Sequence, residues 1–182
     1  MGIADWMVEI EKKYLLQENG IVHVQSHLKT FYRSVDDLGG DVLKNGVSIQ
    51  QGYLPLNVGL DLAKKAGMTY DFTPEEARLR DKGGAFYFTL KGKGGLVRDE
   101  EESKIPEDLF TASWPRTEGK RVTKVRLPRV CGDLTIEFDC YLDRDLAVAE
   151  VEFRSVEEAS AFPPLGLDIT EDKKYKNKNL AK

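Results

Sequence analysis

Charged residues alternate with apolar residues along several segments of the sequence, and this spacing could support chemistry. In Glu9-Ile10-Glu11-Lys12-Lys13, two carboxylates and an amine stand at every second position, and Arg78 and Arg80 repeat the spacing later. A β-strand points successive side chains to opposite faces. Each such segment therefore predicts a strand with one ionised face and one apolar face.

The predicted ionised faces carry both signs of charge. Their carboxylates are Glu9, Glu11, Glu100, Glu102, Glu137, Asp139, Glu150 and Glu152. Their cations are Lys13, Arg78, Arg80, Lys91, Arg98, Lys124 and Arg126. Mg²⁺ and Mn²⁺ prefer carboxylate oxygens and bridge them to phosphates, while Arg and Lys bind the phosphate oxygens themselves. The mixture predicts a site for a short phosphate chain with Mg²⁺ or Mn²⁺, where phosphoryl transfer proceeds by positioning and charge neutralisation.

The simpler interpretation of one such strand is an antiparallel sheet whose charged face lies in water. The pattern recurs in seven segments, however, and their polar positions hold almost only charged residues, whereas a solvated face normally also contains Thr, Ser and Gln. With few helices to cover a sheet, this favours closure into a barrel that leaves no free edge and turns its ionised face inward. We therefore expect an α+β fold, an eight-stranded antiparallel closed β-barrel (a tunnel) with a charged lumen and a few flanking helices, in a single domain over 1–182.

The elements that must position these residues can be placed approximately. The predicted strands are Met7–Leu16, Gly46–Leu56, Glu76–Lys82, Ala85–Lys91, Gly95–Ile105, Arg121–Pro128, Leu134–Leu142 and Val148–Phe153. Gly83-Gly84 and Gly94-Gly95 predict tight turns on both sides of the fourth. Helical spacing predicts a helix over 24–44 that ends at Gly39-Gly40, and others over 60–66, 155–162 (with Ser155 and Glu158 as a capping box) and 170–181.

Composition excludes several classes of protein. The chain has 182 residues and a net charge of -4, and its acidic balance argues against general nucleic-acid binding. It has no apolar run long enough for a membrane span, and its first residues lack the pattern of a secretory signal. Two cysteines are too few for a disulfide scaffold or a Cys-based zinc site. We expect a cytoplasmic protein with a small-molecule partner, and the sequence is compatible with a homodimer.

Seven motifs in order closely resemble the CYTH superfamily, also called triphosphate tunnel metalloenzymes. They are Glu9-x-Glu11-x-Lys13, Gln51-Gly52-Tyr53, Arg78-x-Arg80, Thr89-Leu90-Lys91, Arg98-x-Glu100-x-Glu102, Glu137-x-Asp139 and Glu150-x-Glu152. The segment Thr170–Asn177 is similar to the C-terminal segment of bacterial members, whose type is the inorganic tripolyphosphatase. The resemblance spans Val8 to Ala181, but the gaps at 14–50 and 54–77 are longer than in the bacterial type and would lie near the tunnel mouths.

The resemblance implies a role for each site residue. The implied metal ligands are Glu9, Glu11, Glu150 and Glu152, with Asp139 and Glu137 serving a second metal. The implied phosphate ligands are Lys13, Arg78, Arg80, Lys91, Arg98, Lys124, Arg126 and Lys173, the last on a segment that folds over one tunnel mouth. The implied catalytic residues are Lys91, suspected of helping to activate water, and Glu100 and Glu102.

Three functions stay open on the sequence. The leading prediction is a metal-dependent hydrolase that removes the terminal phosphate of a short triphosphate, most simply inorganic tripolyphosphate. The second is another activity of the superfamily, such as class IV adenylate cyclase or a nucleotide or thiamine triphosphatase. The third is a polyphosphate-binding module without turnover.

Overall fold

The computed structural model describes residues 7–182. Its strands are β1 (Met7–Glu18), β2 (Ile21–Val22), β3 (Val47–Leu54), β4 (Glu76–Lys82), β5 (Ala85–Gly94), β6 (Val97–Lys104), β7 (Arg121–Cys131), β8 (Leu134–Tyr141), β9 (Leu146–Glu152) and β10 (Leu167–Asp168). Its α-helices are α1 (Val35–Asn45), α2 (Leu56–Lys65), α3 (Glu107–Ser113), α4 (Val156–Ala161) and α5 (Asn177–Leu180). Short 3₁₀ helices cover Ser26–Thr30, Trp114–Thr117 and Lys173–Tyr175.

The eight longer strands form a closed antiparallel barrel. Hydrogen-bonded neighbours follow the order β1-β6-β5-β4-β3-β7-β8-β9, and β9 also pairs with β1, which closes the ring. The two-residue strands β2 and β10 pair with β1 outside this path. This topology confirms the predicted eight-stranded antiparallel barrel with a few helices. Within the described residues, no helix is long and apolar enough to cross a membrane.

Contacts within the chain divide it into two compact units. Unit 1 includes residues 7–9, 50–122 and 176–182, and unit 2 comprises 10–49 and 123–175. Strands β1, β3 and β7 each contribute residues to both units. That the chain is one domain stays a prediction.

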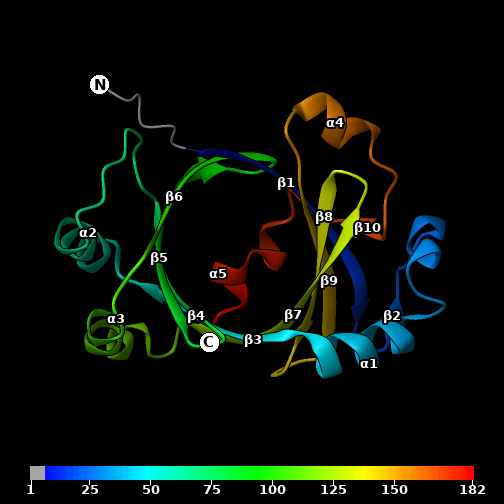
Figure 1. Ribbon diagram of the computed structural model, residues 1–182, viewed down its shortest axis with the longest axis horizontal. Coiled ribbons are helices and arrows are strands. Elements are labelled where there is room, and N and C mark those ends of the chain that lie inside the picture. The colour runs from blue at the N-terminus through cyan, green and yellow to red at the C-terminus, as the bar shows by residue number, and fades with distance from the viewer. Residues whose placement is uncertain (1–6) are drawn as a thin grey trace. The chain divides into compact units, whose positions relative to one another are not determined.

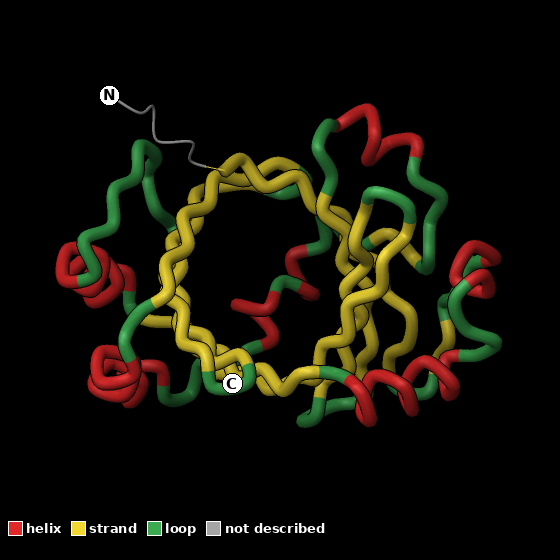
Figure 2. Tube along the Cα trace, viewed as in Figure 1, coloured by secondary structure: helices red, strands yellow, loops and turns green. Residues whose placement is uncertain are grey.

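In unit 1, helices α2 and α3 cover the apolar side of β4 and β5 (Figures 1 and 2). Leu79 and Phe88, both fully buried, pack with Leu62 of α2 and Phe110 of α3 in one core cluster. Burying a side chain of this size contributes about 1.5–3 kcal/mol. The helix approaches β4 closely, because a Cβ added at Gly59 would lie 2.2 Å from the Cβ of Ala77.

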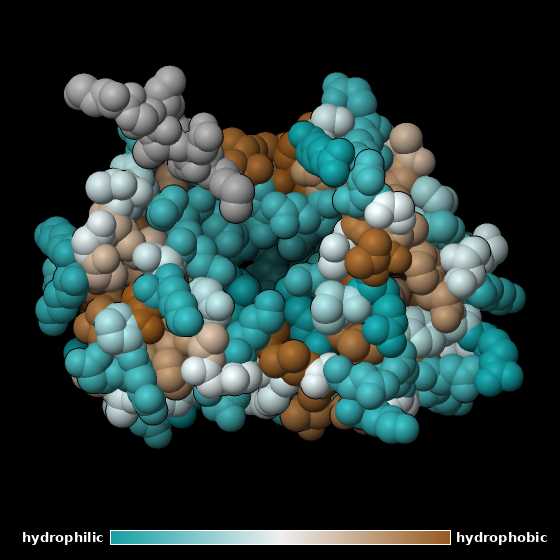
Figure 3. All heavy atoms as spheres, viewed as in Figure 1, coloured by the Kyte–Doolittle hydropathy of each residue, from teal (hydrophilic) through white to brown (hydrophobic). Residues whose placement is uncertain are grey.

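The opposite side of α2 is solvated. Figure 3 shows hydrophilic side chains along its outer surface, where Asp61 and Lys64 are exposed. The alternation along β4 and β5 then fixes where the charges go. Since Leu79 and Phe88 face the helices, Arg78 and Lys91 must face away from them, yet both are buried. The predicted division into an apolar and an ionised face is confirmed for these strands.

In unit 2, α1 packs against β8. Leu38 and Val42 of α1 are fully buried. The rings of Phe31 and Tyr32 contact the ring of Phe138 on β8, and the Tyr32 and Phe138 rings meet edge-on with their centroids 5.4 Å apart. Apolar residues thus cover one side of β8, whose charged residues alternate with them.

The prediction of one continuous helix over 24–44 is wrong. A 3₁₀ helix ends at Thr30 and α1 begins only at Val35, because Ser34 is extended and its hydroxyl accepts a hydrogen bond from Asp37 N. The glycine pair expected to end the helix lies inside α1, which continues to Asn45.

Two other helix predictions are partly confirmed. Ser155 caps α4 by accepting from Glu158 N, but the Glu158 carboxylate accepts from Arg154 N instead of the Ser155 N–H of a capping box. The helix predicted over 170–181 is interrupted at Lys176, which is extended, so it becomes a 3₁₀ helix followed by α5. Helix α3 was not predicted, because a seven-residue helix shows too little periodicity.

Candidate active site

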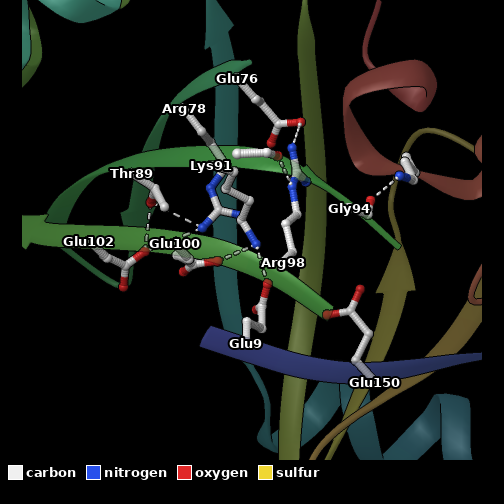
Figure 4. Close-up of polar contacts among 12 residues, drawn as sticks. Glu9, Glu76, Arg78, Thr89, Lys91, Gly94, Arg98, Glu100, Glu102 and Glu150 are labelled. Carbon is white, nitrogen blue, oxygen red and sulfur yellow. Dashed lines mark hydrogen bonds and ion pairs between the residues drawn. The ribbon is translucent and has the colours of Figure 1, made fainter. Parts of the chain in front are cut away.

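In unit 1, the buried face of β4, β5 and β6 gathers charged residues from strands that lie side by side (Figure 4). The strand register sets their partners, since it places Arg78 opposite Thr89 and Lys91 opposite both Glu76 and Glu100. We call this set the β4–β6 cluster. It comprises Glu9, Glu76, Arg78, Arg80, Thr89, Lys91, Arg98, Glu100 and Glu102.

Lys91 lies between two carboxylates of the β4–β6 cluster (Figure 4). Its Nζ is 2.8 Å from Glu9 Oε2 and also forms an ion pair with Glu100. Burial raises the pKa of Glu9 more than Lys91 lowers it. Burial also acts to raise the pKa of Glu100, but Lys91 and Arg78 outweigh it and lower that pKa to about 2. Two carboxylates whose pKa values are pushed apart around one ammonium are typical of a site for proton transfer.

Glu102 holds both arginines of β4. Its Oε2 is 3.3 Å from Arg78 Nη2 and 3.7 Å from Arg80 Nη1, and it accepts a 2.7 Å hydrogen bond from Thr89 Oγ1. Arg78 Nη2 also donates to Thr89 Oγ1 at 3.1 Å. Both guanidinium groups are fixed in direction, and the buried Nε of Arg78 has no partner among residues 7–182, so Arg78 can still donate to a ligand.

Arg98 is anchored by a carboxylate that the sequence analysis missed. Its Nε donates to Gly92 O at 2.7 Å, and its Nη2 is 3.1 Å from Oε2 of the buried Glu76. Glu76 extends the alternating series of Arg78 and Arg80 by one step toward the start of β4. That step was the signal that could have identified it.

In unit 2, Arg126 of β7 is the centre of a second cluster. Its Nε and Nη2 bind Asp139 in a fork at 2.6 and 2.7 Å, and it forms further ion pairs with Glu137 and Glu150. The register places Arg126 opposite Asp139 and Glu137 opposite Glu150. We call this set the β7–β9 cluster. It comprises Lys13, Lys124, Arg126, Glu137, Asp139 and Glu150.

Two lysines complete the β7–β9 cluster. Lys124, 1% exposed, donates to Asp139 Oδ2 at 2.5 Å, and Lys13 Nζ is 3.0 Å from Glu150 Oε1. Burial and the nearby Arg126 lower the pKa of Lys124 to about 8. Burial acts to raise the pKa values of Asp139 and Glu150, but the surrounding cations outweigh it and lower both.

The remaining predicted site residues lie outside these two clusters. Glu11 on β1 and Glu152 on β9 are directly opposite each other in register. Lys173 is exposed on the 3₁₀ helix Lys173–Tyr175 and is not among the buried cations. From the same end of the chain, Lys176 Nζ donates instead to Gly94 O at 2.8 Å.

The residues expected to bind metal have suitable donor atoms but do not form a compact site. Among residues 7–182, no three Asp, Glu, His or Cys side chains come together as a metal site. Glu9, Asp139 and Glu150 are each paired with a lysine or arginine. Their carboxylate oxygens, and those of the facing Glu11 and Glu152, are the donors that Mg²⁺ and Mn²⁺ prefer, so the donor chemistry fits a hard divalent cation.

We expect Glu100 to make the protein sensitive to acid. Its pKa in the folded protein, about 2, is below its ordinary value of 4.5. The stability that ionised Glu100 contributes is therefore fully present above pH 4.5 and is lost as the pH falls toward 2. Glu100→Gln should lower the free energy of unfolding by roughly 1–3 kcal/mol at pH 7, and the difference from wild type should shrink below pH 4.5.

Urea unfolding of both proteins, repeated at several pH values from about 3 to about 7, measures this difference. The exposed Glu118 is the matched control, and Glu118→Gln should leave the profile unchanged. A difference for Glu100→Gln that stays constant over the whole range would contradict the assignment.

Comparison with known proteins identifies relatives of the chain. No protein-family model matches it. Over 112 residues it is 44% identical to the inorganic triphosphatase of Nitrosomonas europaea, a match that covers 58% of this chain and 74% of that protein. The crystal structure of the inorganic triphosphatase NE1496 is 31% identical with a TM-score of 0.53, covering 96% of this chain and 95% of that one. A further crystal structure, of the hypothetical protein NE1496, is 33% identical with a TM-score of 0.51, covering 95% and 97%.

These matches extend over most of both chains. The chain therefore belongs to the CYTH superfamily, in the family of the bacterial inorganic triphosphatases.

Proposed function

We propose that this chain is a metal-dependent hydrolase that releases the terminal phosphate of a short triphosphate, most simply inorganic tripolyphosphate. The observation that carries the proposal is the row of buried, oriented cations in the β4–β6 cluster, where Arg78 is 5% and Lys91 8% exposed. Carboxylates of the same cluster offset the charge of these cations, so a ligand that draws the cations away from them must itself carry dense negative charge. The name of the relative that is 44% identical, an inorganic triphosphatase, supports this substrate class.

Arg78, Arg80 and Arg98 would hold the phosphate chain. Each is already directed by a carboxylate, Glu102 for the first two and Glu76 for the third, so little ordering remains when a phosphate binds. Fixed cations stabilise the charge that develops on phosphate oxygens during transfer. In unit 2, Lys13, Lys124 and Arg126 supply the same kind of donor.

In unit 2, Mg²⁺ or Mn²⁺ would be held by carboxylates among Glu11, Glu150 and Glu152, with Asp139 and Glu137 available for a second ion, and in unit 1 Glu9 offers the same kind of donor. When bound, such an ion neutralises phosphate oxygens and makes a bound water more acidic. Glu100, with its low pKa, stays ionised at neutral pH and holds Lys91 Nζ. Lys91 Nζ is thereby positioned to donate a hydrogen bond to the attacking water or to a phosphate oxygen.

Orthophosphate release tests the proposal over a panel of substrates. The panel contains tripolyphosphate, ATP, thiamine triphosphate and 5′-triphosphorylated RNA, each with Mg²⁺, with Mn²⁺ and with EDTA. We expect fastest release from tripolyphosphate and none with EDTA. Cyclic AMP formed from ATP would instead indicate a cyclase, and tight tripolyphosphate binding without turnover would indicate a binding module.

We predict that Arg78→Ala raises the KM for tripolyphosphate roughly 10- to 100-fold, because it removes a charged hydrogen-bond donor worth about 1.5–3 kcal/mol. Steady-state kinetics at saturating metal measures the change. The exposed Arg116 provides the control, and Arg116→Ala should leave KM unchanged. An unchanged KM for Arg78→Ala would contradict a role in holding phosphate.

A further inference from the structure

Strand β3 places two polar residues of unit 1 on the same side as the charges of β4. A Cβ added at Gly52 would lie 2.5 Å from the Thr117 side chain, and Leu54 packs in the apolar core beneath α2. Gln51 and Tyr53 alternate with these residues and must face the other way. Since β3 and β4 are neighbours in the sheet, this is the side on which Arg78 lies.

Gln51 is completely buried, yet one end of its amide has no partner. Its Nε2 donates to Tyr53 Oη at 2.8 Å, while Oε1 has no hydrogen-bond partner within residues 7–182. The Nε of Arg78 is likewise buried without a partner in that part of the chain. A buried polar atom left unsatisfied costs about 1–3 kcal/mol, so such atoms usually have a functional reason.

Tyr53 connects Gln51 to Arg78. Burial lowers the pKa of Arg78, but Glu100 and then Tyr53 are the two groups that most strongly raise it, and the net change is upward. Tyr53 is therefore near enough to the guanidinium to influence its pKa. The amide that Tyr53 holds lies on the same buried face as a cation with a free donor.

We propose that Gln51 is a substrate-binding residue whose side-chain amide, held by Tyr53, donates a hydrogen bond to an oxygen of the phosphate chain bound by Arg78. Phosphate oxygens only accept hydrogen bonds, so the end of the amide that meets them must be the NH₂ group. Rotating the side-chain amide of Gln51 by half a turn exchanges its oxygen and its NH₂ group. The hydrogen bond to Tyr53 is kept, because the Tyr53 hydroxyl can donate to Oε1 as well as accept from Nε2. The inference rests on the proposed triphosphatase function.

Gln51→Glu is the sharpest test of this role. The carboxylate has nearly the shape of the amide and still accepts from the Tyr53 hydroxyl, so a purely structural role is preserved. Its negative charge, however, would face the phosphate chain. We expect the KM for tripolyphosphate to rise at least about tenfold, because like charges in a buried site repel strongly. Gln51→Met, which keeps the length but not the hydrogen bond, should raise KM about 3- to 10-fold.

The neighbouring residue provides a matched control. Gln50 is exposed, on the opposite face of β3, so Gln50→Glu adds the same charge one residue away and should leave KM unchanged. The Gln51 amide has two possible roles, to bind the Tyr53 hydroxyl and to bind the phosphate chain. Tyr53→Phe separates them, since it removes the hydroxyl and keeps the amide. Thermal unfolding of each variant confirms that it is folded.

The result that overturns the proposal is a KM for folded Gln51→Glu equal to that of Gln50→Glu and wild type. An effect of Tyr53→Phe equal to that of Gln51→Met, with Gln51→Glu unchanged, would likewise show that the amide only supports Tyr53. If Gln51→Glu does not fold, a KM for folded Gln51→Met equal to that of wild type overturns the proposal. Calorimetric binding of tripolyphosphate repeats the comparison without turnover, so a wild type that binds but releases no orthophosphate refutes the hydrolase and still tests Gln51.

Discussion

Glu11→Gln should reduce metal-supported orthophosphate release from tripolyphosphate by at least about 100-fold, since even residues that only support a metal ligand cost 10- to 100-fold when changed. Glu11 faces Glu152 across the β1–β9 pairing, so the substitution removes one of two facing carboxylates at a position suited to a hard cation. Glutamine keeps the shape of the side chain and lacks its charge, and the fold should therefore be retained.

The measurement is the steady-state rate over a range of Mg²⁺ and Mn²⁺ concentrations, with circular dichroism to confirm folding. The metal concentration for half-maximal rate should rise together with the loss of rate. Glu157→Gln on the exposed side of α4 is the control and should behave like wild type. Wild-type rates and metal dependence in Glu11→Gln would end its assignment as a metal ligand.

Arg126→Met should lower the free energy of unfolding by about 3–5 kcal/mol, the range measured when one partner of a buried ion pair is removed. Arg126 forms ion pairs with three carboxylates, of which Asp139 is completely buried. Methionine fills much of the space of the arginine stem. The loss therefore measures the unpaired charges and not a cavity.

Urea unfolding monitored by fluorescence and circular dichroism gives this value, provided that both transitions coincide. Arg129, three residues along β7, is the matched control because its side chain is 40% exposed and pairs with Asp41. Arg129→Met should cost less than about 1 kcal/mol, as is usual for pairs near the surface. A loss for Arg126→Met as small as that of Arg129→Met would mean that Lys13 and Lys124 are sufficient to balance the cluster.

The sequence predicted the strands and their faces well, because alternation is a local property of the chain. The segment from Glu76 to Lys82 occurs as β4 with the bounds predicted, and its arginines lie on the buried charged face. Burial of the same charges could be inferred only from the recurrence of the pattern over many strands.

The contacts between charges could not be predicted in the same way. Which carboxylate meets Lys91 depends on the register between β5 and β6, and register is a property of the assembled sheet. The break before α1 depends on one cap, Ser34, inside a run that otherwise has helical spacing. Glu76 was missed although the predicted strand includes it, because the charged positions of that strand were counted only from Arg78 onward.

The pairing of Lys91 with Glu9 has a consequence for how a ligand enters. The β4–β6 cluster does not present uncompensated positive charge, since its cations Lys91, Arg78 and Arg98 are each paired with a carboxylate of the cluster. A phosphate oxygen that attracts the Lys91 ammonium leaves the Glu9 carboxylate uncompensated, and a divalent cation carried by the phosphate chain can take the vacated place. Under the proposed function, binding would exchange ion pairs within the protein for ion pairs with the ligand, which would disfavour a bare anion such as sulfate and favour a polyphosphate that carries its metal.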